Sequence, residues 1–172
     1  MAQIKPVTKV KLLIGAMYKE KEILDKTIGM LKERFGVIES TLEYSFDFTD
    51  YYEEETGKEL KKQLLIFKDL IDRELLADIK NWTNEIEGMF SEKDKRKINL
   101  DPGYLTMHNV VLASAKEMPH KIYIGKGMFG DVVLEYKSKS FQHSNHTFPD
   151  FKSDKVKEFL NKARENYKKE IK

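Results

Sequence analysis

Hydrophobic and polar residues follow two periods along the first hundred residues. Residues 10–14 and 63–70 are apolar on both faces, which predicts two inner strands, with a helix as the alternative for the second. Residues 38–48 alternate apolar with polar side chains, which predicts a strand with one solvated face. Residues 97–101 alternate again, and the following Pro102 and Gly103 predict a turn that ends this fourth strand.

Two segments between these strands repeat apolar residues at helical spacing. Residues 23–35 predict a helix ended by Gly36, and residues 75–90 predict a second helix with Asp72 placed to cap it. The resulting order of strand, helix, strand, strand, helix, strand is that of the split βαβ unit, in which two helices cover one face of a four-stranded antiparallel sheet. We therefore predict an α+β protein with a ferredoxin-like core over residues 9–105.

Residues 106–172 extend this core. We predict an added helix at 105–116, a β-hairpin formed by 120–124 and 131–137, and a C-terminal helix that follows an N-cap at Ser153. This last helix is amphipathic and serves either as cover for the core or as a surface for a partner. Because no repeat, linker or low-complexity tract divides the chain, we expect residues 1–172 to form a single domain.

Composition limits the classes of function. The 31 basic and 29 acidic side chains leave a net charge of +2, so the whole chain offers no long-range field for nucleic acid or an acidic membrane. It has no cysteine, which excludes disulfides and thiolate zinc sites, and no apolar run long enough to span a membrane. We expect a soluble, cytoplasmic protein that binds no membrane and for which nucleic acid is a poor partner.

Carboxylates gather where the second and fourth predicted strands end. In a split βαβ sheet these are the two edge strands and run in the same direction, so Asp47, Asp50 and Asp101 share one end of the sheet. Three such oxygen ligands could hold Mg²⁺ or Mn²⁺, or a pair could act as acid and base. The two edges lie roughly 14 Å apart, so the loops would have to fold inward. The alternative is that Asp50 and Asp101 bond to the backbone in turns.

Neighbouring phenols, an amide and a lysine complete the candidate ligand site, with the lysine offering its charge to an anion such as phosphate. The candidate residues are Asp47, Asp50, Tyr51, Asn99, Asp101, Tyr104 and Lys126. Lys126 lies in a glycine-rich segment that matches the phosphate loop of protein kinases. Because the other kinase segments do not follow, we interpret this segment as the turn of the hairpin.

Other motifs carry less information. The sequence has no Walker loop and no Asn-Lys-x-Asp motif, which excludes an ordinary GTPase but leaves a non-classical nucleotide site open. His143 and His146 have a spacing that metals use, yet no acidic residue or cysteine stands close by in the sequence to complete a site. We therefore favour a polar loop there over a zinc site.

Three segments together resemble a known family: Phe46-Asp47-Phe48-Thr49-Asp50-Tyr51-Tyr52, Asn99-Leu100-Asp101-Pro102-Gly103-Tyr104-Leu105 and Ile122-Tyr123-Ile124-Gly125-Lys126-Gly127. The chain resembles an uncharacterised prokaryotic domain-of-unknown-function family from its first strand to residues 146–150. The resemblance implies no established activity. Some members are labelled GTP-binding protein, although this sequence lacks the usual GTPase motifs.

Two classes of function remain. The first is a binding protein for a small anionic ligand or a divalent metal that uses the acidic, tyrosine-rich site, and the sequence leaves open whether it is an enzyme. The second is a non-catalytic protein-interaction module or homo-oligomer that uses the C-terminal helix and an exposed edge strand. RNA binding ranks third, because the polar face of the second strand carries acidic residues that repel phosphate.

Overall fold

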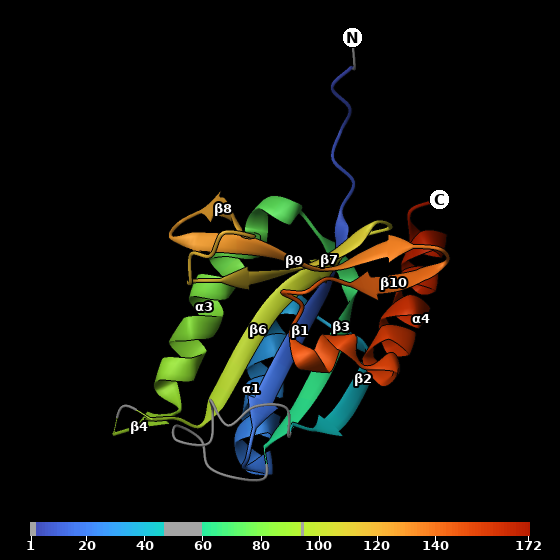
Figure 1. The fold of residues 1–172 in the computed structure, drawn as a ribbon. Coiled ribbons are helices and arrows are strands. Elements are labelled where there is room, and N and C mark those ends of the chain that lie inside the picture. The colour runs from blue at the N-terminus through green and yellow to red at the C-terminus, as the bar shows by residue number, and fades with distance from the viewer. Residues whose placement is uncertain (1–2, 47–59, 94) are drawn as a thin grey trace.

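The computed structural model describes residues 3–46, 60–93 and 95–172. These residues form a mixed α+β fold around a large antiparallel sheet (Figure 1). The strands of this sheet are β1 (Val10–Tyr18), β2 (Ile38–Ser45), β3 (Lys61–Ile71), β6 (Ile98–Leu105), β7 (Asn109–Ser114), β8 (Ile122–Gly125), β9 (Met128–Lys137) and β10 (Ser140–His143). The remaining elements are the helices α1 (Lys21–Phe35), α3 (Leu76–Met89) and α4 (Asp154–Glu170), the 3-10 turns η2 (Arg73–Leu75) and η3 (Pro149–Lys152), and the small strands β4 (Ser91–Glu92) and β5 (Lys95–Arg96).

The sheet consists of two blocks. Its strand order is β10-β9-β7-β6-β1-β3-β2, and β8 pairs with β9. The first block is β6-β1-β3-β2, in which β1 pairs with both β3 and β6 along its length. The second block contains β7 to β10 and joins the first through pairing of β7 with β6 over residues 103–105. In Figure 1 the second block crosses the upper ends of the strands of the first block.

Helices cover both faces of the first block. Leu24 and Leu31 of α1 and Ile79 and Ile86 of α3 pack against one face in a common apolar core. Two helices on one face agree with the pattern of the sequence. On the opposite face α4 packs its apolar side into a second core, so the first block is buried between two layers of helix.

The C-terminal helix is part of this core. Ser153 caps α4 by accepting a hydrogen bond from the backbone N–H of Val156, as predicted. Leu160 and Tyr167 are fully buried or nearly so, and the Tyr167 hydroxyl donates to the carbonyl of Lys9 at 2.7 Å. The apolar side of α4 is therefore occupied by the chain itself and is not a surface for a partner.

The segment after the fourth predicted strand differs from expectation. The prediction of a turn at Pro102–Gly103 and a helix at 105–116 is wrong, because β6 continues to Leu105 and β7 follows. The reason lies in the direction of the backbone groups. Leu100 directs its N–H and its carbonyl to side chains of α3 rather than to β1, and every second residue of a strand repeats that direction. Pro102 lies two residues after Leu100, so its backbone nitrogen also faces away from β1. The pairing of β6 with β1 therefore loses no hydrogen bond at Pro102.

Strand β2 does not alternate as predicted. A bulge follows Ile38, which packs with the core under α1 and α3, whereas Leu42 and Tyr44 pack with the core under α4. The shift also turns Glu39 toward the buried ammonium of Lys11, 3.5 Å away. The prediction that Ile38 shares a side with Leu42 and Tyr44 is therefore wrong.

The predicted hairpin is confirmed by the pairing of β8 with β9. Lys126 and Gly127 connect the two strands with φ values of 52° and 78°, and positive φ at both central residues is typical of the tight turns that match the twist of a hairpin. In the described part of the chain, no helix combines the length and the apolar character that crossing a membrane requires.

Candidate functional site

A cavity of about 350 Å³ lies beside the joint between the two blocks of the sheet. Strand β7 pairs with β6 at residues 103–105 and then separates from it, because Pro102 offers no N–H to continue the pairing. At the joint the backbones are very close: a Cβ built on Gly103 would lie 2.3 Å from the carbonyl oxygen of Val111. Side chains of α3, β6, β7 and β9 and of the segment after β7 line the space that this separation leaves.

Helix α3 takes the place of the missing strand at this edge of β6. Lys80 Nζ donates to the Leu100 carbonyl at 2.7 Å, and Glu87 Oε1 accepts from the Leu100 N–H at 2.6 Å. Arg96 bridges Glu87 and the side-chain oxygen of Asn99, at 3.1 Å to each. Both Lys80 and Glu87 are buried, so the cavity has a rigid, charged wall on this side.

A buried ion-pair network supports Asp101 from the α4 face. Lys62 Nζ lies 3.6 Å from Asp101 and 2.9 Å from Asp150, which accepts a hydrogen bond from the Tyr44 hydroxyl at 2.7 Å. Desolvation raises the pKa of Asp101, but the positive charges of Lys62 and Lys80 outweigh it and hold that pKa below its usual value. Burial and the nearby Asp150 raise the pKa of Tyr44, which therefore remains a hydrogen-bond donor.

The opposite wall comes from the second block. Lys121 Nζ donates to Ser114 Oγ at 3.0 Å and lies 3.9 Å from Asp131. Asp131 is 2% exposed, and neither of its carboxylate oxygens has a hydrogen-bond partner among the described residues. The Nδ2 of Asn99, across the cavity, is likewise buried without a partner in that part of the chain. The cavity thus contains buried polar atoms that the described residues do not satisfy, which is uncommon in folded proteins.

The predicted site residues divide into three groups. Asn99 and Asp101 both line the cavity. Tyr104 instead packs with Leu76 and Val111 beside α3, and Lys126 lies on the hairpin turn, where it is 61% exposed and pairs with Asp78. Asp47, Asp50 and Tyr51 lie outside the described residues, so the proposed metal set of Asp47, Asp50 and Asp101 stays a prediction.

The predicted geometry of the sheet edges needs two corrections. The prediction that the second and fourth strands run in the same direction is wrong: the antiparallel pairs β2–β3, β3–β1 and β1–β6 make β2 and β6 run in opposite directions, so these two strands end at opposite ends of the sheet. We expected the strand that carries Asp101 to be an edge strand, with Asp101 at one end of the sheet. Strand β6 is instead an inner strand, flanked by β1 and β7. Asp101 therefore reaches the cavity from the middle of the sheet, and the cations near it come from α3 and β3 rather than from Lys126.

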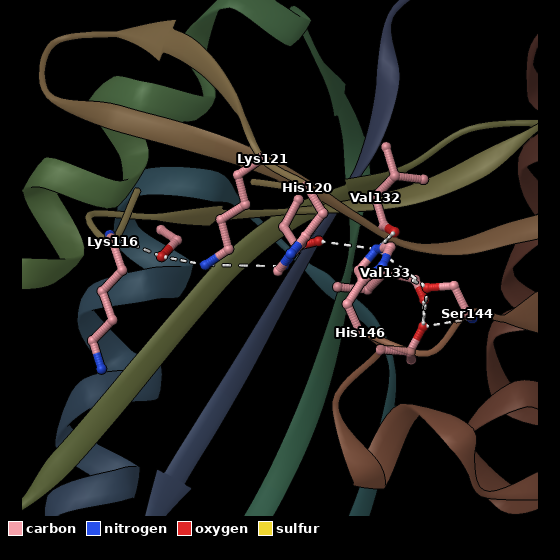
Figure 2. A network of polar contacts seen from close by, with 10 residues as sticks. Lys116, His120, Lys121, Val132, Val133, Ser144 and His146 are labelled. Atoms are coloured by element: carbon pink, nitrogen blue, oxygen red, sulfur yellow. Dashed lines mark hydrogen bonds and ion pairs between the residues drawn. The ribbon is translucent and has the colours of Figure 1, made fainter. Parts of the chain in front are cut away.

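Sequence reasoning missed the residues of α3 and one cluster of the second block. Lys80 and Glu87 lie seven residues apart, and each directly follows an apolar residue of the predicted helix face, Ile79 and Ile86, so their place beside the buried side of the helix could have been noticed. His146, in contrast, does not act with His143. Its ring stacks on that of His120 beside Asp131 (Figure 2), and no local pattern links these segments.

Comparison with known proteins agrees with the resemblance seen in the sequence. No curated protein and no solved structure matches the chain. The model of one family, described as a domain of unknown function (DUF4416), matches residues 8–167. Since this match covers nearly the whole sequence, the chain belongs to the DUF4416 family.

Proposed function

We propose that the chain binds a small anionic ligand, such as a phosphate-bearing metabolite, in the cavity between β6 and β7. The observation that carries this proposal is that four cationic side chains, Lys80, Arg96, Lys116 and Lys121, line the cavity together with the buried Nδ2 donor of Asn99. Anions bind where several donors converge in a site of low dielectric. Phosphorylated metabolites are abundant in the cytoplasm, the location that we propose for this cysteine-free chain.

Acidic side chains also line the cavity, and the repulsion that each exerts on an anion depends on how closely a cation is paired with it. Glu87 is neutralised by Arg96 and Lys80, and Asp101 is neutralised by Lys62, whereas Asp131 faces the more distant ammonium of Lys121, 3.9 Å away. Ser114 Oγ already accepts from Lys121 and from the backbone of Lys116, so its own hydrogen is available to a ligand oxygen. A phosphate that receives hydrogen bonds from Asn99, Ser114 and Lys121 would give the buried amide of Asn99 the acceptor that it needs.

The test is isothermal titration with orthophosphate, pyrophosphate and a nucleotide set that includes ATP and GTP. We expect at least one of these anions to bind, and its Kd to increase at least tenfold in Lys121→Met and Asn99→Leu. Lys32→Met, an exposed lysine of α1 on the far face of the sheet, is the matched control and should bind as the parent does. Absence of binding at millimolar concentration, or equal binding by all variants, would contradict the proposal.

The first block of the sheet supports a finer proposal about the fold. We infer that β1, α1, β2, β3, α3 and β6 form a ferredoxin-like core to which the second block and α4 have been added. The order β6-β1-β3-β2 with α1 and α3 on one face supports this interpretation.

A second candidate function is self-association through β8. This short strand pairs with β9 on one side and exposes Ile122 and Tyr123 to 72% and 60%. An apolar strand with an unpaired edge can add the same strand of a second copy. Light scattering tests this: Ile122→Lys should reduce the molar mass of any dimer to that of a monomer, whereas Val37→Lys, at an exposed apolar residue elsewhere, should not.

A further inference from the structure

Two histidines and one aspartate of the second block converge on a single point. His120 precedes β8, Asp131 lies in β9, and His146 follows β10. One ligand atom from each lies within 4.8 Å of the other two. The imidazole nitrogens are 3.5 Å and 3.8 Å from the oxygens of Asp131, and the two rings stack with their centroids 4.2 Å apart (Figure 2).

The burial of Asp131 is the second, independent observation. A carboxylate that is 2% exposed and receives no hydrogen bond from the described residues is costly unless a cation neutralises it. The ammonium of Lys121 is 3.9 Å away, beyond hydrogen-bond distance, and donates to Ser114 instead. A neutral imidazole brings no charge to Asp131. The site therefore offers one negative charge and, in the tautomers that leave Nε2 unprotonated, two nitrogen lone pairs. To bind an ion, His146 Nε2 has to give up its contact with the Val132 carbonyl, 3.3 Å away.

The loop of His146 is held in place by polar contacts. Thr147 Oγ1 donates to the Val133 carbonyl at 2.6 Å and accepts from the backbone N–H of Ser144 at 2.9 Å. The Ser144 hydroxyl lies 3.0 Å from His146 Nδ1. Contacts of this kind orient the ligands of a metal site before the ion binds.

We propose that His120, Asp131 and His146 bind one divalent transition-metal ion of the zinc type. Ligands 2.0–2.2 Å from a tetrahedral zinc ion are separated by about 3.4 Å, and the distances from Asp131 to His120 and His146, 3.5 Å and 3.8 Å, are close to this value. The two rings stack nearly parallel, so they rotate when both direct a lone pair at one ion. Imidazole nitrogen favours zinc and its neighbours in the transition series, whereas Mg²⁺ and Ca²⁺ prefer oxygen ligands. Three protein ligands leave a coordination position open, as in zinc sites that bind a further molecule.

The site adjoins the cavity, because Asp131 and Lys121 also form part of the cavity wall. An ion held by Asp131 would therefore place positive charge at one end of the cavity. If the anionic ligand proposed above binds there, one of its oxygens can complete the coordination of the ion. This last step alone depends on the proposed function; binding of the metal does not.

The experiment is titration of the untagged, metal-free chain with ZnCl₂ by calorimetry, repeated with Co²⁺ and followed by visible absorption. We expect one Zn²⁺ per chain with a Kd below about 10 µM and a higher melting temperature, since an ion that binds only the folded state stabilises it. His120→Gln and His146→Gln should each weaken binding at least tenfold. Because the chain has no cysteine, thiolates cannot account for any binding.

His143→Gln is the matched control. His143 lies in β10, shares the short sequence motif with His146 and is exposed. It should bind Zn²⁺ as tightly as the parent, whereas a site made by His143 and His146 would lose the ion. No binding to the parent, or retained binding in both His120→Gln and His146→Gln, would overturn the proposal. Binding of Zn²⁺ without any anion binding would leave the metal site standing and contradict the proposed function instead.

Discussion

Two buried charges, Lys11 in the first block of the sheet and Asp131 in the second, differ in how the chain satisfies them. In the first block Lys11 is fully buried, and its ammonium donates to both carboxylate oxygens of Glu170 at 2.7 Å and to the Lys68 carbonyl at 3.1 Å. In the second block Asp131 is almost as deeply buried and receives no hydrogen bond from the described residues. Both charges are buried, but only Lys11 is hydrogen-bonded within the described chain, and the metal ion proposed above would supply the partner of Asp131.

The architecture accounts for this difference. Strand β1 is paired along both edges and lies between two helical layers, so every polar group within it must find a partner in the chain. The second block joins the first over residues 103–105, and the cavity opens beside this joint. Beside this joint the chain leaves Asn99 Nδ2 and the Asp131 carboxylate without a hydrogen bond from the described residues, and both residues line the cavity.

The largest effect should come from the joint itself. In Gly103→Ala the new Cβ would collide with the backbone of Val111, and the clash must be relieved by separating β6 from β7. We expect a loss of about 3 kcal/mol in the free energy of unfolding, measured by urea denaturation. Gly88→Ala is the control: a Cβ added there on α3 would meet no atom of the described residues within 4 Å, and alanine should raise stability by about 0.5–1 kcal/mol. A loss under about 1 kcal/mol for Gly103→Ala would mean that the joint is loose.

The next largest loss of stability should follow from breaking the ion pair between Lys11 and Glu170. Glu170→Ala removes the carboxylate that neutralises Lys11 and leaves the ammonium with the Lys68 carbonyl and the more distant Glu39. We expect a loss of about 2 kcal/mol in chemical denaturation, because a buried charge without its partner keeps the cost of desolvation.

The controls for this pair test the mechanism. Glu158→Ala removes an exposed carboxylate from the same helix and should change stability by less than about 0.5 kcal/mol. Lys11→Met should cost less than Glu170→Ala, because the stranded carboxylate of Glu170 is partly exposed to water. If Lys11→Met were the more damaging change, packing of the lysine rather than its charge would be the source of the stability.

A smaller effect depends on pH and concerns Asp101. Its folded pKa lies below that of the unfolded chain, so its contribution is fully present above the unfolded value of about 3.9 and is lost as the pH falls through the folded pKa. Asp101→Asn should therefore cost about 1–2 kcal/mol at pH 7 and progressively less below about pH 4, as measured by urea denaturation at each pH. A cost that is independent of pH would show that the shape of Asp101, not its charge, matters.

Local patterns in the sequence predicted most of the first block. The β-branched run at residues 10–14 and the helical repeat before Gly36 identify β1 and α1, because these elements are defined by which faces they bury. The same reasoning failed at residues 105–116, where β7 was interpreted as a helix. Whether Pro102 ends a strand depends on which neighbour its N–H would face, and that is decided by the whole sheet.

The candidate site was predictable to a lesser degree. Asp101 was found because it ends the alternating run at residues 97–101 before Pro102, and Asn99 was found as the neighbouring amide; that reasoning placed both on an edge strand, whereas they lie on the inner strand β6. Lys80 and Glu87 escaped notice although they directly follow Ile79 and Ile86, which lie on the buried face of α3. The cluster of His120, Asp131 and His146 could not be found in this way, because its members come from three segments that only the folding of the second block brings together.

The smallest change in stability is expected for Asp131→Asn, and it tests most directly how Asp131 differs from Lys11. Asp131→Asn removes a buried charge that accepts no hydrogen bond from the described residues, so the metal-free protein should lose less than about 1 kcal/mol in urea denaturation, less than for Glu170→Ala. The same variant should lose the rise in melting temperature that Zn²⁺ gives to the parent, because the carboxylate supplies the negative charge of the proposed site. A loss of about 2 kcal/mol or more without metal would mean that His120, His146 and Lys121 already neutralise Asp131. In that case Lys11 and Asp131 would both be neutralised from within the chain, and the contrast between them would disappear.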